Sequence, residues 1–189
     1  MSVDGFVEVV DEDRLAERVA RLGERISVDY AGLDPVLVGV LQGSVIFTAD
    51  LIRHVTVPAE VDFLSLTRFG GQGRVGIAMD TEVSLEGRHV IVVEDIVDTG
   101  LTLTTLRRLL EARGVASLAT AALIDKASRR IVSVDLEYRG FEVGDEFLLG
   151  YGLDWEGRYR NVRSLWAVMD LPALSRDPDS FAGIAYRGR

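Results

Sequence analysis

One stretch of the sequence, residues 89–106 (HVIVVEDIVDTGLTLTTL), constrains the fold more than any other. It opens with residues 90–93, an apolar, β-branched run that is typical of a strand buried on both faces. Glu94 and Asp95 follow directly, and a short polar turn begins at Asp98. Apolar residues then recur with the spacing of one helix face, at Leu103, Leu106, Leu109 and Leu110. The stretch therefore predicts a strand, a tight loop and a helix in series.

The turn of residues 98–102 has the properties of a phosphate-binding loop. Backbone amides at the start of a helix have no partner within the helix, so they can donate to an anion. Gly100 allows a ligand to approach the backbone closely, and Thr99 and Thr102 add hydroxyl groups. We therefore expect the neighbouring acids to face a different part of the ligand, such as sugar hydroxyls, a metal ion or a base.

Three other interpretations of this stretch exist. Asp98-Thr99-Gly100 is the triplet of aspartic proteases, but those enzymes are all-β, and the helix predicted after Thr102 argues against them. Haloacid-dehalogenase-like phosphatases have two aspartates two residues apart after the strand, whereas Asp95 and Asp98 are three apart. The simplest alternative is a buried strand that ends in a solvated acidic turn.

The composition limits the class of protein. A chain of 189 residues with 48% apolar and 27% charged residues fits one ordinary globular domain. A net charge of -9 disfavours binding to nucleic acid or to an anionic membrane. No apolar run approaches the roughly 18 residues of a membrane span, and the N-terminus lacks a signal-peptide pattern. With no cysteine in the chain, disulfides are excluded, and we expect a cytoplasmic protein.

The rest of the chain repeats the pattern of strand and helix. Apolar runs predict strands at residues 6–10, 36–41, 61–66 and 116–124, with helices between several of them. Asp11 is expected to cap the first helix, whose core face is Leu15, Val19, Leu22 and Ile26. Four glycines in residues 67–80 predict a mobile lid. The fold class is therefore α/β, with a mainly parallel sheet flanked by helices and a small hood built from the late short strands, including runs at 136–138 and 141–143.

One residue after the fourth of these strands is unusual. Of the 21 basic residues all but Lys126 are arginine, so the chain uses arginine wherever either residue would serve. A single lysine in such a background suggests a specific role for its ammonium group.

The residues from Glu94 to Thr102 resemble the signature of the type I phosphoribosyltransferases. Further along, Lys126 with Arg130, Phe147-Leu148, Asp154 and Arg160 stand in the order and spacing of the hypoxanthine-guanine phosphoribosyltransferases. The similarity extends from about Val7 to Asp170, nearly the whole chain.

The resemblance implies how the sugar and the base are bound. Glu94 and Asp95 would hold the ribose hydroxyls, and the loop Asp98, Thr99, Gly100, Leu101 and Thr102 would hold the 5-phosphate of 5-phospho-α-D-ribose 1-diphosphate (PRPP). Asp98 would also take the N7 proton of the purine as general base. Lys126 would face the purine 6-oxygen, Phe147 would stack on the base, and the Leu148 backbone would contact its N1 and C2 edge.

The resemblance also implies a pyrophosphate and Mg²⁺ site. Mg²⁺ would be held by Asp154, with Glu94 and Asp95. The pyrophosphate contacts would be Gln42 and Gly43, after a cis bond between Leu41 and Gln42, together with Arg68, Arg130 and Arg160. The chain departs from the family at Gln42, where purine members commonly have Lys or Arg, and at Arg68-Phe69, where they usually have Ser-Tyr.

The expected activity is transfer of the phosphoribosyl group from PRPP to N9 of hypoxanthine or guanine, for purine salvage. The resemblance also implies a homodimer or a homotetramer. We expect the phosphoribosyltransferase domain in residues 1–171 and a tail in residues 172–189 that is disordered or wraps a neighbouring subunit. Two alternatives remain: the same mechanism with another acceptor, such as xanthine or a specialised heterocycle, and a non-catalytic regulator that senses PRPP or nucleotides.

Overall fold

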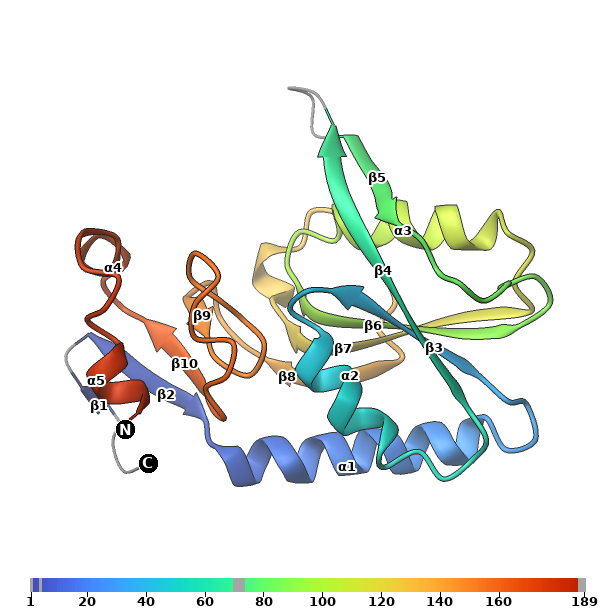
Figure 1. The fold of residues 1–189 in the computed structure, drawn as a ribbon, viewed down its shortest axis with the longest axis horizontal. Coiled ribbons are helices and arrows are strands. Elements are labelled where there is room, and N and C mark those ends of the chain that lie inside the picture. Colours follow the sequence, from blue (N-terminus) through green and yellow to red (C-terminus); the bar gives the residue numbers. More distant parts are fainter. Residues whose placement is uncertain (1, 4, 70–73, 187–189) are drawn as a thin grey trace.

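The computed structural model describes residues 2, 3, 5–69 and 74–186 of the chain. Within this part the strands form two separate sheets, one of six strands and one of four. Figure 1 shows the larger sheet with its helices as one body, which we call the core, and the smaller sheet with the C-terminal helices beside it, which we call the hood. The long helix α1 (Glu12–Asp29) runs from the hood along the core.

The core sheet is mainly parallel, as predicted. Its strand order is β5-β4-β3-β6-β7-β8, and all neighbouring pairs are parallel except β4 with β5. The strands are β3 (Val36–Leu41), β4 (Glu60–Phe69), β5 (Arg74–Met79), β6 (His89–Val97), β7 (Ser117–Asp125) and β8 (Tyr138–Glu142). The predicted lid thus begins and ends as the two strands of an antiparallel hairpin, and residues 70–73 at its tip lie outside the described residues.

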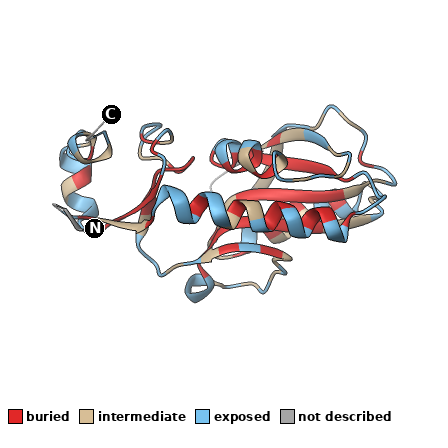
Figure 2. Ribbon diagram, turned by 90° about the horizontal axis from the view of Figure 1, so that it is seen from below, coloured by how far each residue is buried: buried red, intermediate tan, exposed pale blue. Residues whose placement is uncertain are grey.

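Alternation along the strands places apolar side chains on both faces of this sheet. In β6, Ile91 and Val93 belong to the apolar cluster that includes α1 and α2 (Val45–Ile52), while Val90 and Val92 belong to the cluster that includes α3 (Leu101–Glu111). A strand covered on both sides needs an unbroken apolar run, which is why the sequence identified it. Figure 2 shows these central strands as the most buried part of the molecule.

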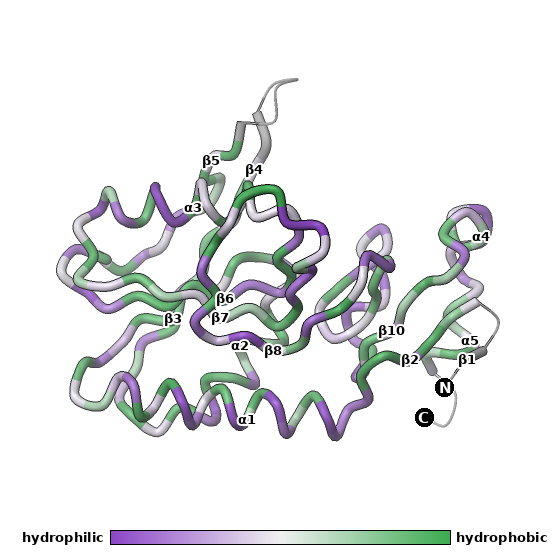
Figure 3. Tube along the Cα trace, turned by 180° about the vertical axis from the view of Figure 1, so that it is seen from behind, coloured by the Kyte–Doolittle hydropathy of each residue, from purple (hydrophilic) through white to green (hydrophobic). Residues whose placement is uncertain are grey.

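The first helix follows the prediction closely. The Asp11 side chain accepts a hydrogen bond from Arg14 N at 2.8 Å and caps α1. The predicted core face is buried, at Leu15, Val19, Leu22 and Ile26. Along the tube of α1 in Figure 3, apolar and polar residues accordingly alternate.

The hood combines both ends of the chain. Its strand order is β1-β2-β10-β9, all antiparallel, with β1 (Ser2–Val3), β2 (Phe6–Val10), β9 (Phe147–Leu149) and β10 (Leu165–Val168). The prediction that late strands alone build the hood was therefore incomplete, because β2 pairs with β10. It also misassigned the runs at 136–138 and 141–143, since β8 includes residue 138 of the first and residues 141–142 of the second, and it joins the edge of the core sheet.

The C-terminal tail is not disordered within the described residues, and that expectation was wrong. It forms α4 (Leu171–Arg176) and α5 (Ala182–Ala185), and it packs against this chain's own hood. The Phe181 ring is fully buried, with its centroid 4.6 Å from that of Phe6 and 5.6 Å from that of Trp166. Two short helices with few apolar residues leave no periodic pattern to detect. The domain boundary at residue 171 stays a prediction.

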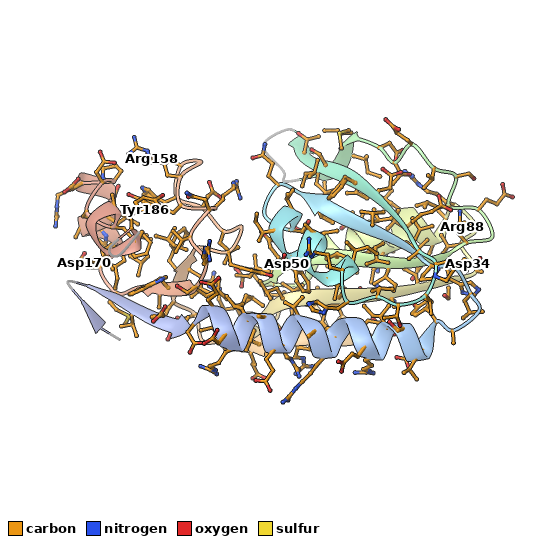
Figure 4. The ribbon with its side chains drawn as sticks, turned by 60° about the horizontal axis from the view of Figure 1, so that its bottom comes forward. Asp34, Asp50, Arg88, Arg158, Asp170 and Tyr186 are labelled. Atoms are coloured by element: carbon orange, nitrogen blue, oxygen red, sulfur yellow. The ribbon has the colours of Figure 1, made fainter. Side chains whose placement is uncertain are left out.

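The carboxyl ends of the parallel strands point toward the hood. Figure 4 shows Asp34 and Arg88, which precede β3 and β6, at the end of the core away from the hood, where Arg88 Nη2 donates to Asp34 O at 3.3 Å. Ligands of open α/β sheets bind outside the carboxyl ends of the strands. The side facing the hood is therefore where a site is expected.

None of the helices in the described part of the chain is long and apolar enough to span a bilayer.

Candidate active site

The two acids of the central motif lie inside a strand rather than after it. We predicted that the strand ends near Val93, but β6 continues to Val97 because Ile96 and Val97 maintain its apolar character. Glu94 pairs in register with Ala122 of β7 and is only 7% exposed. Its carboxylate has no hydrogen bond or ion pair that involves another described residue. Asp95 accepts a hydrogen bond from Ile96 N at 2.8 Å.

The phosphate loop is a sharp turn followed directly by a helix. Asp98, Thr99 and Gly100 form the turn, and α3 begins at Leu101, two residues earlier than the first predicted face residue. Gly100 has φ +84°, and a methyl group on it would come 2.4 Å from the carbonyl oxygen of Val132. Only glycine fits this position, because the left-handed backbone and the close approach both exclude a side chain.

A large cavity opens beside this turn. Its volume is about 1130 Å³, and Glu94 and the whole predicted phosphate loop line it. The opposite wall comes from β3, β4 and β5 through Leu41, Thr67 and Val75. A cavity of this size accommodates a sugar phosphate with a base. Glu94 and the predicted phosphate loop therefore share one open space and are not sealed inside the core, whereas Asp95 is not among the residues that line this cavity.

A second group of predicted residues meets around Gly43. The bond between Leu41 and Gln42 is cis, as the resemblance implied. A methyl group on Gly43 would lie 1.5 Å from Asp95 Oδ2, and one on Gly152 would lie 2.1 Å from the Gly43 carbonyl oxygen. Asp95 of the core and Gly152 near the hood thus contact Gly43 from two sides. Sequence analysis gave Gly152 no role, although the spacing Gly150-Tyr151-Gly152 is a signal for close backbone packing.

Arg160 connects the same group to the predicted magnesium ligand. Its Nη1 donates to the Gly152 carbonyl at 2.7 Å, and its Nη2 lies 2.9 Å from Asp154 Oδ1 and 3.5 Å from Gln42 Oε1. Asp154 also accepts a hydrogen bond from Gly157 N at 2.7 Å. Three residues predicted for pyrophosphate and metal binding are therefore neighbours in space.

The buried acids have strongly perturbed pKa values. Burial raises the pKa of Glu94 well above its usual value, and the neighbouring charge of Asp95 raises it further. Burial also raises the pKa of Asp95 to about 6, although the amides of Ile96 and Asp95 and the charge of Arg160 oppose the shift. Neither carboxylate forms an ion pair or accepts a hydroxyl hydrogen bond from another described residue, and a ligand can supply such partners.

These acids fit Mg²⁺ only in combination with a ligand. Within residues 2, 3, 5–69 and 74–186, no group of three or more His, Cys, Asp and Glu side chains could hold a metal ion. Mg²⁺ usually takes one or two carboxylates and completes its shell with water and substrate phosphates. Asp154 and Asp95 are close enough to influence each other electrostatically, and both offer the hard oxygen ligands that Mg²⁺ prefers. The donor set therefore suits magnesium bound together with a diphosphate.

The predicted base-binding residues Lys126, Phe147 and Leu148 are not among the residues that line the large cavity. Lys126 is 6% exposed, and its Nζ donates to Glu146 O at 2.7 Å, which leaves part of its donor capacity for a ligand. Burial lowers the pKa of Lys126, while the charges of Asp98 and Glu146 oppose this shift. Leu148 is buried in β9. The ring of Phe147 meets the ring of Trp155 edge to face at 5.4 Å, a support that sequence analysis did not foresee.

Two consecutive arginines surround the predicted general base. Arg129 Nε lies 2.8 Å from Asp98 Oδ1 and forms an ion pair with it. The contact does not have the geometry of a hydrogen bond, and Asp98 Oδ1 accepts none from the described residues. Arg130 Nη1 donates to the Asp98 carbonyl oxygen at 2.7 Å, and Arg130 Nη2 pairs with Asp125. Asp125 was also missed, although an acid at the end of an apolar strand, directly before the single lysine, was a visible signal.

Two further observations complete the placement of the predicted residues. The side chain of Arg68 lies outside the described residues, so its pyrophosphate contact stays a prediction. A second cavity of about 440 Å³ between α1, α2 and the hood contains only Arg160 of the predicted set. There Tyr151 donates to Asp50 Oδ2 at 2.6 Å. Figure 4 shows Asp50 on the side of the core that faces the hood.

Comparison with known proteins agrees with this geometry. The family model described as a phosphoribosyl transferase domain matches residues 7–156. The hypoxanthine-guanine phosphoribosyltransferase of Streptococcus pneumoniae (strain ATCC BAA-255 / R6) is 40% identical over 158 residues, which cover 82% of this chain and 88% of that protein.

Solved structures give the same result. A hypoxanthine-guanine phosphoribosyltransferase from Bacillus anthracis has a TM-score of 0.83 and 39% identity, covering 86% of this chain and 98% of that one. A hypoxanthine phosphoribosyltransferase from Staphylococcus aureus has a TM-score of 0.84 and 33% identity, covering 88% and 92%. The family resemblance and the fold class expected from the sequence are thereby confirmed. The chain belongs to the hypoxanthine-guanine phosphoribosyltransferase family.

Proposed function

We propose that this protein transfers the 5-phosphoribosyl group from PRPP to N9 of hypoxanthine or guanine and releases pyrophosphate. One observation carries the proposal: in a chain of this family, a buried acid of β6 and the complete phosphate loop line one cavity. The glycosyltransferase activity provides purine nucleotides by salvage of free bases.

The sugar phosphate is held from two directions. Amides at the start of α3 and the hydroxyls of Thr99 and Thr102 bind the 5-phosphate. Glu94 and Asp95 accept hydrogen bonds from the ribose hydroxyls. These acids have few protein partners, so the hydroxyls and the metal stabilise charge that burial otherwise disfavours.

The leaving group is bound at the junction of core and hood. The backbone of Gln42 and Gly43 and the guanidinium of Arg160 contact the pyrophosphate. Asp154, with Glu94 and Asp95, would hold Mg²⁺, which neutralises negative charge on the diphosphate when it is bound. Gln42 offers an amide where a cation is common in the family, so the backbone and Arg160 carry most of this contact.

Bond breaking and bond making occur at C1 of the ribose. The bond from C1 to the pyrophosphate oxygen breaks, positive charge develops on the sugar, and N9 of the purine bonds to C1. Asp98, the first residue of the phosphate loop, takes the proton from N7, since its charge acts on Lys126 and its carboxylate is therefore near the proposed base site. Negative charge of the acids near the sugar also stabilises the cationic transition state.

Lys126 determines which purines are accepted. Its ammonium donates to the purine 6-oxygen and has no capacity to accept. An adenine amino group in the same place would set a donor against a donor, and a site rejects such an analogue strongly because polar groups remain unpaired. Phe147, supported by Trp155, stacks on the base.

A pyrophosphate-release assay tests the proposal. The protein is incubated with Mg²⁺ and PRPP, and hypoxanthine, guanine, xanthine and adenine are added separately. We expect release with hypoxanthine and guanine. Release with xanthine alone would point to another acceptor, and no release with any base would indicate a sensor of PRPP.

Asp98→Asn tests the assigned base. The amide keeps the shape of the turn but cannot take a proton, so we expect normal binding of PRPP and a loss of turnover of about 10²-fold or more. Turnover close to that of the unmodified protein would remove Asp98 from the mechanism.

The assembly and location of the protein follow from family resemblance and composition only. We propose a homodimer or homotetramer, which light scattering of the purified protein at several concentrations would test. The predicted cytoplasmic location can be examined by fractionation of the source cells.

A further inference from the structure

Arg130 lies between two parts of the core that are far apart in the sequence. Its side chain is 16% exposed, and it uses both terminal nitrogens inside the protein. Nη1 donates to the carbonyl oxygen of Asp98, and Nη2 pairs with Asp125, which is 2% exposed. The planar guanidinium allows one side chain to hold a carbonyl and a carboxylate at fixed positions.

The residues after Arg130 continue the same contact. Ile131 N and Val132 N both donate to the Thr99 carbonyl oxygen, at 2.9 Å and 3.1 Å. The Val132 carbonyl oxygen and Arg130 Cδ lie against Gly100, where a methyl group would come within 2.4 Å and 3.1 Å of them. Each residue of the turn 98–100 is thus contacted by the segment 130–132.

Asp125 anchors this arrangement at the end of β7. It is paired in register with Val97, the last residue of β6, so it sits beside the point where the turn begins. Its second cation is Arg139, whose Nε lies 3.1 Å from Asp125 Oδ2. Within the described residues Arg139 forms ion pairs with Asp125 and Glu142 and none with the turn, so it shares the anchor of Arg130 but not its contact with Asp98.

We propose that Arg130, anchored by Asp125, is a positioning residue that fixes the turn 98–100. It thereby sets the direction of the Asp98 carboxylate and of the amides that bind the 5-phosphate. This role differs from the pyrophosphate contact implied by the family resemblance, because each terminal nitrogen directs a hydrogen bond to a partner inside the protein, Asp98 or Asp125. The inference rests on the proposed function, because it concerns the same phosphate loop.

The two roles differ in the ligands they affect. A positioning residue for the phosphate loop matters for every ligand with a 5-phosphate, including a nucleotide that has no pyrophosphate. A pyrophosphate contact matters for pyrophosphate and PRPP but not for the nucleotide. Inosine monophosphate, the proposed product, therefore separates the two roles.

The experiment measures binding of inosine monophosphate and of pyrophosphate with Mg²⁺ by calorimetry. The proteins are the unmodified chain, Arg130→Met, Arg130→Lys, Asp125→Asn and the matched control Arg139→Met. We expect Arg130→Met to bind the nucleotide about tenfold more weakly or worse, the change that corresponds to losing one charge-assisted hydrogen bond. Arg130→Lys recovers part of the affinity, and Asp125→Asn loses affinity because Arg130 loses its anchor.

The control removes the other cation of Asp125 without touching the turn. Arg139→Met is expected to bind the nucleotide within about twofold of the unmodified protein. Circular dichroism checks that each variant is folded, and if Arg130→Met is not, Arg130→Lys and Asp125→Asn decide the outcome.

Two results would overturn the inference in distinguishable ways. If the Arg130 and Asp125 variants bind inosine monophosphate normally but bind pyrophosphate more weakly, Arg130 is a pyrophosphate ligand and only the positioning role fails. If the unmodified protein binds neither ligand, the proposed function fails, and the inference fails with it.

Discussion

Two neighbouring strands of the core sheet carry carboxylates that differ in their partners. At the end of β7, Asp125 is paired with Arg130 and with Arg139. In β6, Glu94 is buried and Asp95 is partly buried, but neither makes an ion pair within the described residues. A carboxylate is therefore paired with cations in one strand, whereas in the neighbouring strand Glu94 has no such partner and lines a cavity.

The difference separates a structural role from a binding role. A buried carboxylate with a cation has its desolvation largely compensated, and removing one partner leaves an unpaired charge. A buried carboxylate without a cation raises the free energy of the folded protein, and such groups concentrate at functional sites. The pairing of an acid, rather than its burial, indicates which role it has.

Removal of Asp125 should have the largest effect on stability. In Asp125→Asn the Arg130 guanidinium loses its partner in a mostly buried position, so we expect the free energy of unfolding to fall by about 3 kcal/mol. Denaturant unfolding followed by circular dichroism measures this. A loss below about 1 kcal/mol would mean that the pair is not structural. Arg139→Met is the control, and it should cost less because the Arg139 side chain is half exposed.

Removal of the Asp95 charge should increase the free energy of unfolding, the opposite of the effect expected for Asp125→Asn. Asparagine keeps an oxygen for the Ile96 amide but carries no charge, so Asp95→Asn should stabilise the protein by about 1 to 3 kcal/mol at pH 8. The same variant should lose most transferase activity. Unfolding and pyrophosphate release measured on one preparation test both parts, and a destabilised variant would contradict the comparison.

The pH dependence of the free energy of unfolding gives a second test of the unpaired Asp95 carboxylate. The pKa of Asp95 is raised from 3.8 to about 6, so between these values the folded protein retains a proton that the unfolded chain has released. The free energy of unfolding should therefore fall as pH rises through this window, with no further change from this group above it. Glu94 shifts in the same direction. The stability difference between Asp95→Asn and the unmodified protein should be small near pH 4 and reach its maximum above about pH 7.

An exposed pair should show the smallest effect. Glu17 and Arg21 on α1 lie 2.5 Å apart, but both side chains are more than 60% exposed. Glu17→Gln should change the free energy of unfolding by less than about 0.5 kcal/mol, since water screens the pair. A change as large as that of Asp125→Asn would show that pairing alone, without burial, determines the contribution of an acid.

Local features of this fold and site were predictable from sequence. The apolar run before Glu94 identified the strand, and Asp11 with the spacing from Leu15 to Ile26 identified α1. Gly100 and its threonine neighbours identified the sharp turn before α3, which we propose as the phosphate loop. These features depend on residues close in sequence, because strand and helix periods and left-handed turns are set by local backbone geometry.

Other features were settled by contacts between distant segments. β2 joined the hood rather than the core, Gly43 came to lie between Asp95 and Gly152, and Arg130 used both terminal nitrogens on Asp98 and Asp125. The sequence by itself determined the central strands, the first helix and the turn before α3. Only the tertiary structure decided which acids are paired with cations, because that depends on which surfaces meet when the sheets and loops pack.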